Sequence, residues 1–220
     1  MTTNTAFLWL SAGITAFAGG LAMQGADFGE QAWLLSRASG LIAYGLLSAS
    51  VVLGLLLSTR TAKHVIPARV AADLHAFLSV LSIVFLALHG GALLFDGFFH
   101  YTLLSLLVPF VSPSNPFWTG LGVIGGWATA LVTASVRVRK QIGYGAWRRL
   151  HYVSFLAWAA SLVHGLAAGT DTALAPVQVL YIGSAALVSG LLMLRLLARP
   201  AAKASRGAPA GERGSISRAA

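Results

Sequence analysis

Cysteine is absent from the chain. Its absence excludes disulfide bonds and iron–sulfur clusters held by thiolates. It also excludes covalently attached c-type haem, which requires a C-x-x-C-H motif. Any cofactor is therefore expected to be held by other ligands.

Charge is also scarce: charged residues make up 10% of the 220 residues, whereas 57% are hydrophobic. The mean hydropathy of +0.77 lies far above that of a soluble domain, so the composition predicts an integral membrane protein. Six apolar stretches have the length of about 20 residues that a helix needs to cross roughly 30 Å of hydrocarbon. They are residues 5–23, 38–57, 70–95, 117–136, 150–168 and 175–197. We therefore predict an all-α, polytopic bundle of six transmembrane helices within residues 1–198.

The first stretch is interpreted as a helix and not as a signal peptide. Residues 1–5 hold no Lys or Arg, and no small-x-small cleavage site follows. Residues 199–220 are rich in Ala, Gly, Ser, Pro and Arg, and we expect a disordered basic tail there. Residues 96–116 are apolar and aromatic but contain three prolines, so we expect a lid along the membrane interface.

The 15 basic residues are placed asymmetrically, because all except Arg37 fall on one side of the six-span topology. Short cytoplasmic loops hold an excess of Lys and Arg, so this side and both termini are predicted to be cytoplasmic. The net charge of +9 is therefore interpreted as a topology signal that indicates contact with membrane lipids and no nucleic acid. The basic residues of this side are Arg60, Lys63, Arg69, Arg137, Arg139, Lys140, Arg148, Arg149, Arg195, Arg199, Lys203, Arg206, Arg213 and Arg218.

The stretch "GLGVIG", Gly120 to Gly125, matches the G-x-G-x-x-G nucleotide fingerprint. No strand is predicted before it and it lies inside the span 117–136, so we interpret Gly122 and Gly126 as helix-packing residues. With no other fingerprint, the chain is expected to lack a flavin or nicotinamide domain of its own.

Two spans each carry two histidines, one near each end. His75 and His89 lie fourteen residues apart, and His151 and His164 lie thirteen apart. Both spans run outward in the predicted topology, so His75 should lie level with His151, and His89 with His164. The two levels are separated by roughly 20 Å along the membrane normal.

Ionisable residues inside a membrane are costly and are functional candidates by default. Neutral imidazoles that face each other without a carboxylate or thiolate suit the axial positions of haem iron better than zinc or a hard cation. The pattern therefore predicts two non-covalent b-type haems with bis-histidine ligation. The helical period disagrees with this arrangement in one respect, because thirteen residues place His164 about 140° from His151. The fifth span must therefore tilt, distort or present its two ligands from different flanks.

Other residues receive weaker assignments. Arg37 outside and Arg69, Arg148 or Arg149 inside are candidate partners of haem propionates, although the inner arginines alternatively only set topology. Phe155 and Trp158 either fill the space between the histidine levels or pack as ordinary core. Gly90 and Gly165 follow the outer histidines and either admit a porphyrin or pack helices. His64 and His100 lie in loops and are given no ligand role.

Two functions of other classes remain open. A non-redox transporter or channel would use the same histidines to relay protons or metal ions, although only Asp73 adds a carboxylate inside a span. A structural subunit would use the four histidines only to hold helices together. That interpretation gives no reason for the histidines of the two spans to lie at matched depths.

The chain resembles the ferric reductase-like transmembrane family, which includes the membrane domains of ferric reductases and NADPH oxidases. The resemblance rests on the two histidine pairs and on "GYGAWRRLH" before the fifth span, and its other stretches are similar to stand-alone bacterial members. It implies an oxidoreductase subunit of the bacterial cytoplasmic membrane that carries electrons outward through two haems. The donor would be a separate flavin-dependent reductase, a reduced flavin or a quinol. The acceptor would be extracytoplasmic, for example ferric iron, oxygen or a methionine sulfoxide reductase.

Overall fold

The computed structural model describes residues 28–59 and 66–197, and the regular structure in these two ranges is entirely helical. The predicted first span at 5–23, the predicted tail at 199–220 and His64 lie outside the described residues. The helices are α2 (Phe28–Thr59), α3 (Ala68–Leu93), α4 (Leu103–Leu107), α5 (Pro116–Ile142), α6 (Tyr144–His151), α7 (Val153–Ala168) and α8 (Ala175–Leu197).

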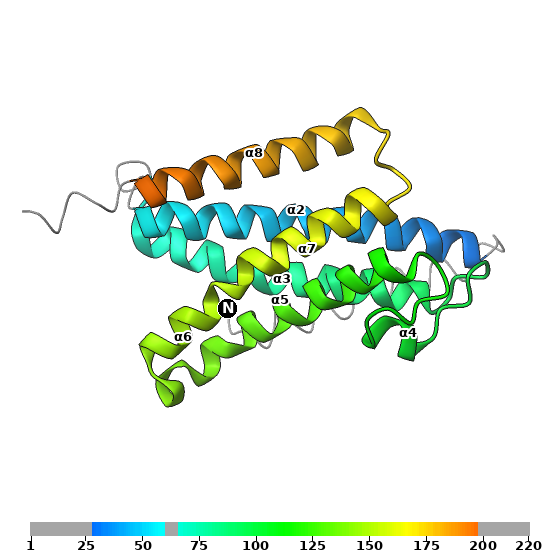
Figure 1. Cartoon of the computed structure of the whole chain (residues 1–220), viewed down its shortest axis with the longest axis horizontal. Coiled ribbons are helices and arrows are strands. Elements are labelled where there is room, and N and C mark those ends of the chain that lie inside the picture. The colour runs from blue at the N-terminus through cyan, green and yellow to red at the C-terminus, as the bar shows by residue number, and fades with distance from the viewer. Residues whose placement is uncertain (1–27, 60–65, 198–220) are drawn as a thin grey trace, which may run out of the picture.

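Five helical segments of the described chain are long and apolar enough to cross a membrane: α2, α3, α5, α6 with α7, and α8. Their long axes lie side by side and alternate in direction, so that α3 and α7 run the same way (Figure 1). The predicted all-α class is therefore confirmed for this part of the chain, and five of its helical segments have the length and composition of membrane spans. The largest difference in bounds is at α2, which begins at Phe28, ten residues before the predicted start, with Glu30 placed favourably in its first turn.

The two ends of the bundle differ in chemistry. We call the end at α6 the basic end, and the end at residues 96–116 the lid end; they lie at the left and right of Figure 1. The basic end carries the C-terminal turns of α5 and α8 and the whole of α6, with Arg139, Lys140, Arg148, Arg149 and Arg195. The lid end carries Arg37, Asp96 and Asp171.

The predicted fifth span is interrupted once. Tyr152 separates α6 from α7, and its N–H donates to the carbonyl oxygen of Arg149 at 3.2 Å, three residues back. Such a tight i→i−3 turn changes the rotation of the helix locally. The interruption follows His151 directly and lies between the two histidines of this span.

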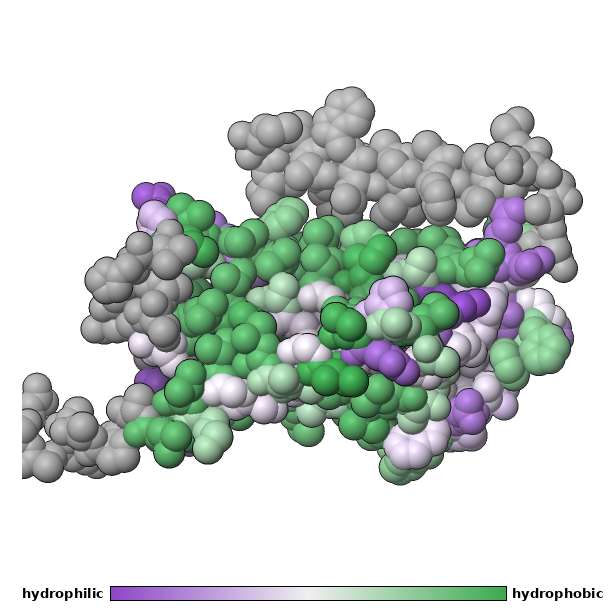
Figure 2. Space-filling view, turned by 90° about the horizontal axis from the view of Figure 1, so that it is seen from above, coloured by the Kyte–Doolittle hydropathy of each residue, from purple (hydrophilic) through white to green (hydrophobic). Residues whose placement is uncertain are grey.

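The core of the bundle lies between α2, α7 and α8. Leu55 and Val188 are 1% and 2% exposed, and the rings of Tyr44 and Tyr181 meet edge to face at 5.0 Å. The Trp158 indole is buried and donates its N–H to the Ser48 hydroxyl at 3.0 Å, so it belongs to this core. Outward-facing positions are also apolar, and Figure 2 shows a broad hydrophobic surface that suits contact with lipid.

The lid is seated on α5. The Trp127 indole N–H donates to the Leu107 carbonyl oxygen at 2.9 Å, and Thr102 caps α4 through a capping box with Ser105. Phe110 adopts a φ of 69°, which is unusual for a bulky residue, and its ring and backbone occupy the space where a Cβ on Gly120 would lie. The missing side chain of Gly120 therefore lets the lid approach the helix.

We expect Leu55→Ala to lower the free energy of unfolding by about 2–5 kcal/mol, because it leaves a cavity in the best-packed part of the core. Leu187→Ala is the matched control, since Leu187 is 51% exposed on α8. Thermal unfolding in one detergent would compare them. Equal losses for the two variants would contradict the core described here.

A candidate functional site of two histidine pairs

The four histidines of α3 and α6–α7 meet as two pairs. The ring centres of His75 and His151 lie 6.0 Å apart, and those of His89 and His164 lie 6.2 Å apart. The rings of each pair are steeply crossed, at 67° and 70°. The first pair lies toward the basic end and the second toward the lid end, since α3 and α7 run in the same direction (Figure 1).

His89 is held by one serine of α2. Its Nδ1 lies 2.8 Å from the Ser36 carbonyl oxygen and 3.1 Å from the Ser36 hydroxyl oxygen. That hydroxyl donates its own proton to the His89 carbonyl oxygen at 3.0 Å. Ser36 therefore presents two acceptors to the same imidazole nitrogen, and it is 2% exposed.

His75, nearer the basic end, is held by Ser50 of α2 in the same way as His89 is held by Ser36. Its Nδ1 lies 2.8 Å from the Ser50 carbonyl oxygen and 3.0 Å from the Ser50 hydroxyl oxygen. A glycine follows each serine by four residues: a Cβ on Gly40 would lie 2.8 Å from the His89 Nδ1, and one on Gly54 would lie 3.3 Å from the His75 ring. Two Ser-x-x-x-Gly segments, fourteen residues apart, thus cradle two histidines that are also fourteen residues apart.

The partner histidines are held differently. The Nδ1 of His164 lies 2.9 Å from the Trp118 carbonyl oxygen on α5, and a Cβ on Gly122 would lie 2.8 Å from its ring. The Nδ1 of His151 is buried and has no hydrogen-bond partner among the described residues. The pair nearer the basic end therefore has one anchored ring and one whose nitrogen lacks an acceptor.

These contacts fix the proton on three of the four rings. A carbonyl oxygen can only accept, so the Nδ1 atoms of His75, His89 and His164 must donate. Each Nε2 is then unprotonated and keeps its lone pair, which is the form in which a neutral imidazole binds a metal ion. No third His, Asp or Glu completes a bare-metal site with either pair in the described part of the chain.

A cavity of about 540 Å³ surrounds the pair nearer the lid. Its walls include His89 and His164, the glycines Gly40 and Gly122, and apolar side chains such as Leu86. This volume falls within the range of about 300–1,000 Å³ that is typical of small-molecule and cofactor sites. The glycines keep the space beside the imidazoles free of side chains.

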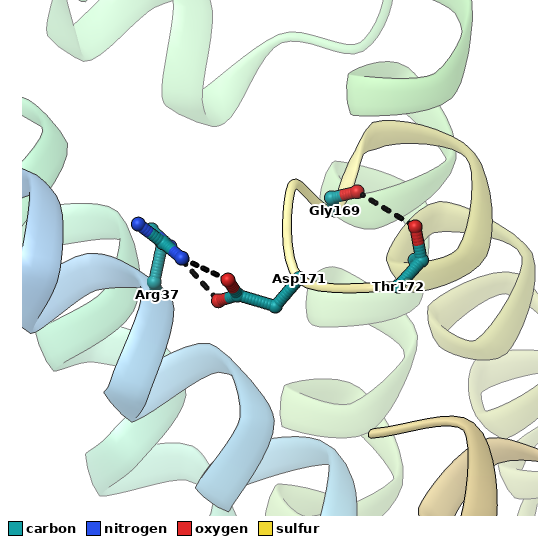
Figure 3. Close-up of polar contacts among 4 residues, drawn as sticks. All are labelled: Arg37, Gly169, Asp171 and Thr172. Carbon is teal, nitrogen blue, oxygen red and sulfur yellow. Dashed lines mark hydrogen bonds and ion pairs between the residues drawn. The ribbon is translucent and has the colours of Figure 1, made fainter. Parts of the chain in front are cut away.

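Arg37 and Asp171 form an ion pair on the wall of this cavity (Figure 3). The Arg37 Nε donates to Asp171 Oδ2 at 2.8 Å, and its terminal nitrogen contacts Oδ1, so the contact is bidentate. Asp171 lies in the connection between α7 and α8, where the Thr172 hydroxyl donates to the Gly169 carbonyl oxygen. The charge of Arg37, predicted to meet a propionate, is therefore shared with a carboxylate.

The remaining predicted residues lie in several places. Arg69 is exposed at the start of α3, and Arg148 and Arg149 are exposed on α6. Gly90 lines the cavity, and a Cβ added to it would meet no other atom within 4 Å. A Cβ on Gly165 would instead collide with the Tyr181 ring, which makes Gly165 a helix-packing residue.

Tyr101, which lies in the lid segment, is a further residue of the cavity wall. Burial raises the pKa of its phenol, so this side chain stays uncharged at neutral pH. The lid therefore adds a neutral hydroxyl to the cavity and no negative charge.

Sequence reasoning missed Ser36, Ser50, Gly40 and Gly54 and gave Gly122 only a packing role. The signal for the first four is present in the chain, because "SRASG" and "SVVLG" repeat with the same fourteen-residue spacing as the histidines. Comparison of the chain with protein families, curated proteins and solved structures finds no match. The functional argument therefore rests on the geometry of the site.

We expect Arg37→Gln and Asp171→Asn each to lower the free energy of unfolding. The double variant should lose less free energy than the two single variants lose together. The difference, which is the coupling energy of the ion pair, should be about 1 kcal/mol. Water screens the pair only in part, because the Arg37 and Asp171 side chains are 32% and 15% exposed. Thermal unfolding of the four proteins measures this coupling energy. Asp96→Asn is the control, because Asp96 accepts hydrogen bonds from the Phe98 and Phe99 N–H groups and not from Arg37. The stability losses of Asp96→Asn and Arg37→Gln should therefore be additive.

Proposed function

We propose that the two histidine pairs hold two b-type haems and that the chain carries electrons across a membrane. The observation that carries the proposal is the repeated pair of facing imidazoles at two levels of one bundle, with three of the four rings in the metal-binding tautomer. In this proposal the chain is a stand-alone member of the ferric reductase-like family, with six spans in a bacterial cytoplasmic membrane. When bound, the two haems would supply one-electron carriers at two depths.

The residues present fit such a group. Two imidazoles on opposite sides of one metal ion, with bonds of about 2 Å, have ring centres roughly 6 Å apart. The observed separations of 6.0 and 6.2 Å agree with this value. Each pair offers two donors, which suits a metal whose other positions are filled by a porphyrin. Gly40, Gly54 and Gly122 leave room beside the rings, and the cavity offers a largely apolar space.

The chain's own groups would orient the ligands and exclude water. Ser36, Ser50 and the Trp118 carbonyl fix three rings and make their Nε2 atoms better electron donors. The lid and the Arg37–Asp171 pair line the cavity toward the lid end. Arg37 reaches a propionate in this proposal only by sharing its charge between that group and Asp171.

The charge distribution orients the proposed path. The basic end would face the cytoplasm, together with both termini, because positive residues gather there. A cytoplasmic donor, such as a flavin-dependent reductase, a reduced flavin or a quinol, would act at this end. An extracytoplasmic acceptor would approach at the lid end, between residues 96–116 and the α7–α8 connection.

Purified protein should contain about two haems per chain and show a low-spin, six-coordinate b-type spectrum. His75→Ala should remove one haem and leave the other spectrum intact, because the two levels share no ligand. His100→Ala, in the lid, is the control and should keep both haems. Pyridine haemochrome assays and absorption spectra measure these outcomes.

A folded but haem-free protein from haem-sufficient cells would falsify the assignment. Metal- or proton-coupled transport by that haem-free protein would instead favour the transporter interpretation. Gly122→Val tests the cradle independently: it should displace His164 and remove the haem nearer the lid, whereas Gly183→Val, at an open position on α8, should not.

Reversing the charge of Arg148 and Arg149 should slow reduction by a soluble anionic donor and make the rate less dependent on salt. Exposed charges act over a Debye length of roughly 8 Å at physiological ionic strength, so their contribution falls as salt rises. Stopped-flow reduction measures the rate, and reoxidation from the lid end serves as the internal control. A rate unaffected by both charge and salt would indicate a membrane quinol as donor.

A further inference from the structure

Two polar nitrogens without hydrogen-bond partners among the described residues lie side by side at the basic end. The Nε1 of Trp147 and the Nδ1 of His151 are both buried, and neither has a partner among the described residues. Their rings belong to successive turns of α6, with centres 5.0 Å apart and planes inclined by 32°. An unpaired buried polar group costs roughly 1–3 kcal/mol, so two adjacent ones indicate a hydrogen-bond partner that the described residues do not supply.

The surroundings favour an acceptor with negative charge. The Arg139 guanidinium lies over the Trp147 ring, with its central carbon 5.3 Å from the ring centre. Arg148 and Arg149 flank Trp147 on α6, and Lys140 follows Arg139. The only ion pair within the described ranges joins Arg37 to Asp171 at the opposite end of the bundle. The positive charge at the basic end is therefore not neutralised by carboxylates of this part of the chain.

We propose that Trp147 and His151 bind the phosphate oxygen of an anionic ligand that the neighbouring arginines attract. Both residues are partly exposed although these two nitrogens are buried, so the site lies at the edge of the bundle. A tryptophan and arginines at the end of a membrane span match the headgroup level of a bilayer. The phosphate can come from a phospholipid headgroup or from a water-soluble molecule, and the chemistry of the contact is the same.

The two halves of the site depend on the proposed function to different degrees. Trp147 Nε1 is a donor in every state, so its role is independent of haem. The role of His151 rests on the proposed function, because its Nδ1 must carry the proton when Nε2 binds iron. A negative oxygen that accepts from this Nδ1 would make the imidazole a stronger ligand, which favours the oxidised metal. Ligand binding would thus lower the reduction potential of one haem and leave the other unchanged.

The test uses the full-length protein in a maltoside detergent, which contains no phosphate. Native mass spectrometry measures binding of phosphatidylglycerol, with a glucosyl diacylglycerol of equal tails as the phosphate-free comparison. Trp147→Phe keeps the ring beside His151 and Arg139 and removes only the N–H, so it should weaken phosphatidylglycerol binding about tenfold. Trp127→Phe is the matched control, because that indole donates to Leu107 at the lid end, and its affinity should match that of the wild type.

The possible outcomes separate the claims. If millimolar inorganic phosphate displaces the lipid, a soluble phosphate is a sufficient ligand. If it does not, the site requires the phospholipid headgroup. Either result supports the site. Equal affinity of Trp147→Phe and wild type overturns it. Spectroscopic redox titration should show that phosphatidylglycerol lowers one potential in the wild type and does so less in Trp147→Phe. Binding that depends on Trp147 without such a shift overturns the role of His151. If the protein proves haem-free when purified from haem-sufficient cells but still binds the lipid through Trp147, the proposed function is overturned and the Trp147 site stands.

Discussion

The hydrogen bond from a histidine Nδ1 to a backbone carbonyl of a neighbouring helix is the contact on which the whole site depends. It fixes the tautomer, the ring orientation and the free Nε2 of His75, His89 and His164 at once. A backbone carbonyl keeps its place only if the helix that carries it does. The packing of α2 against α3, and of α5 against α7, is therefore part of the chemistry as well as of the fold.

Small residues make this packing possible. Ser36, Ser39, Ser48 and Ser50 are all nearly inaccessible; Ser36 and Ser50 face α3, whereas Ser48 faces α7. In a membrane the association of helices gains little from hydrophobic burial, so close approach and interhelical hydrogen bonds supply the stability. The same side chains therefore bring the helices together and provide the acceptors for the imidazoles. Many large apolar side chains also lie on the outer surface, where Figure 2 shows a broad hydrophobic face.

Composition and spacing alone predicted the coarse features of the molecule. Long apolar stretches predicted the membrane helices, and the matched spacing of His75–His89 and His151–His164 predicted that they meet as two pairs, because helical rise converts spacing into depth. The interruption at Tyr152, between His151 and His164, was not predictable, since no Pro or Gly marks it. Arg37 was assigned by its unusual charge, while its partner Asp171 lies 134 positions away in the chain. Only the folded chain brings that pair together.

The fourteen-residue repeat of serine, glycine and histidine equals two heptads, the interval after which antiparallel supercoiled helices present the same face again. The two sites between α2 and α3 therefore share one register, because the same face of α2 meets the same face of α3 at both histidines. One residue inserted between Gly40 and Ser50 would turn the rest of α2 by about 100° and remove one cradle, while the other stayed intact. Seven inserted residues would restore the face but shift the level by about 10 Å. Length changes in this segment are therefore tolerated only in matched pairs on both helices, which ties the evolution of one helix to that of the other.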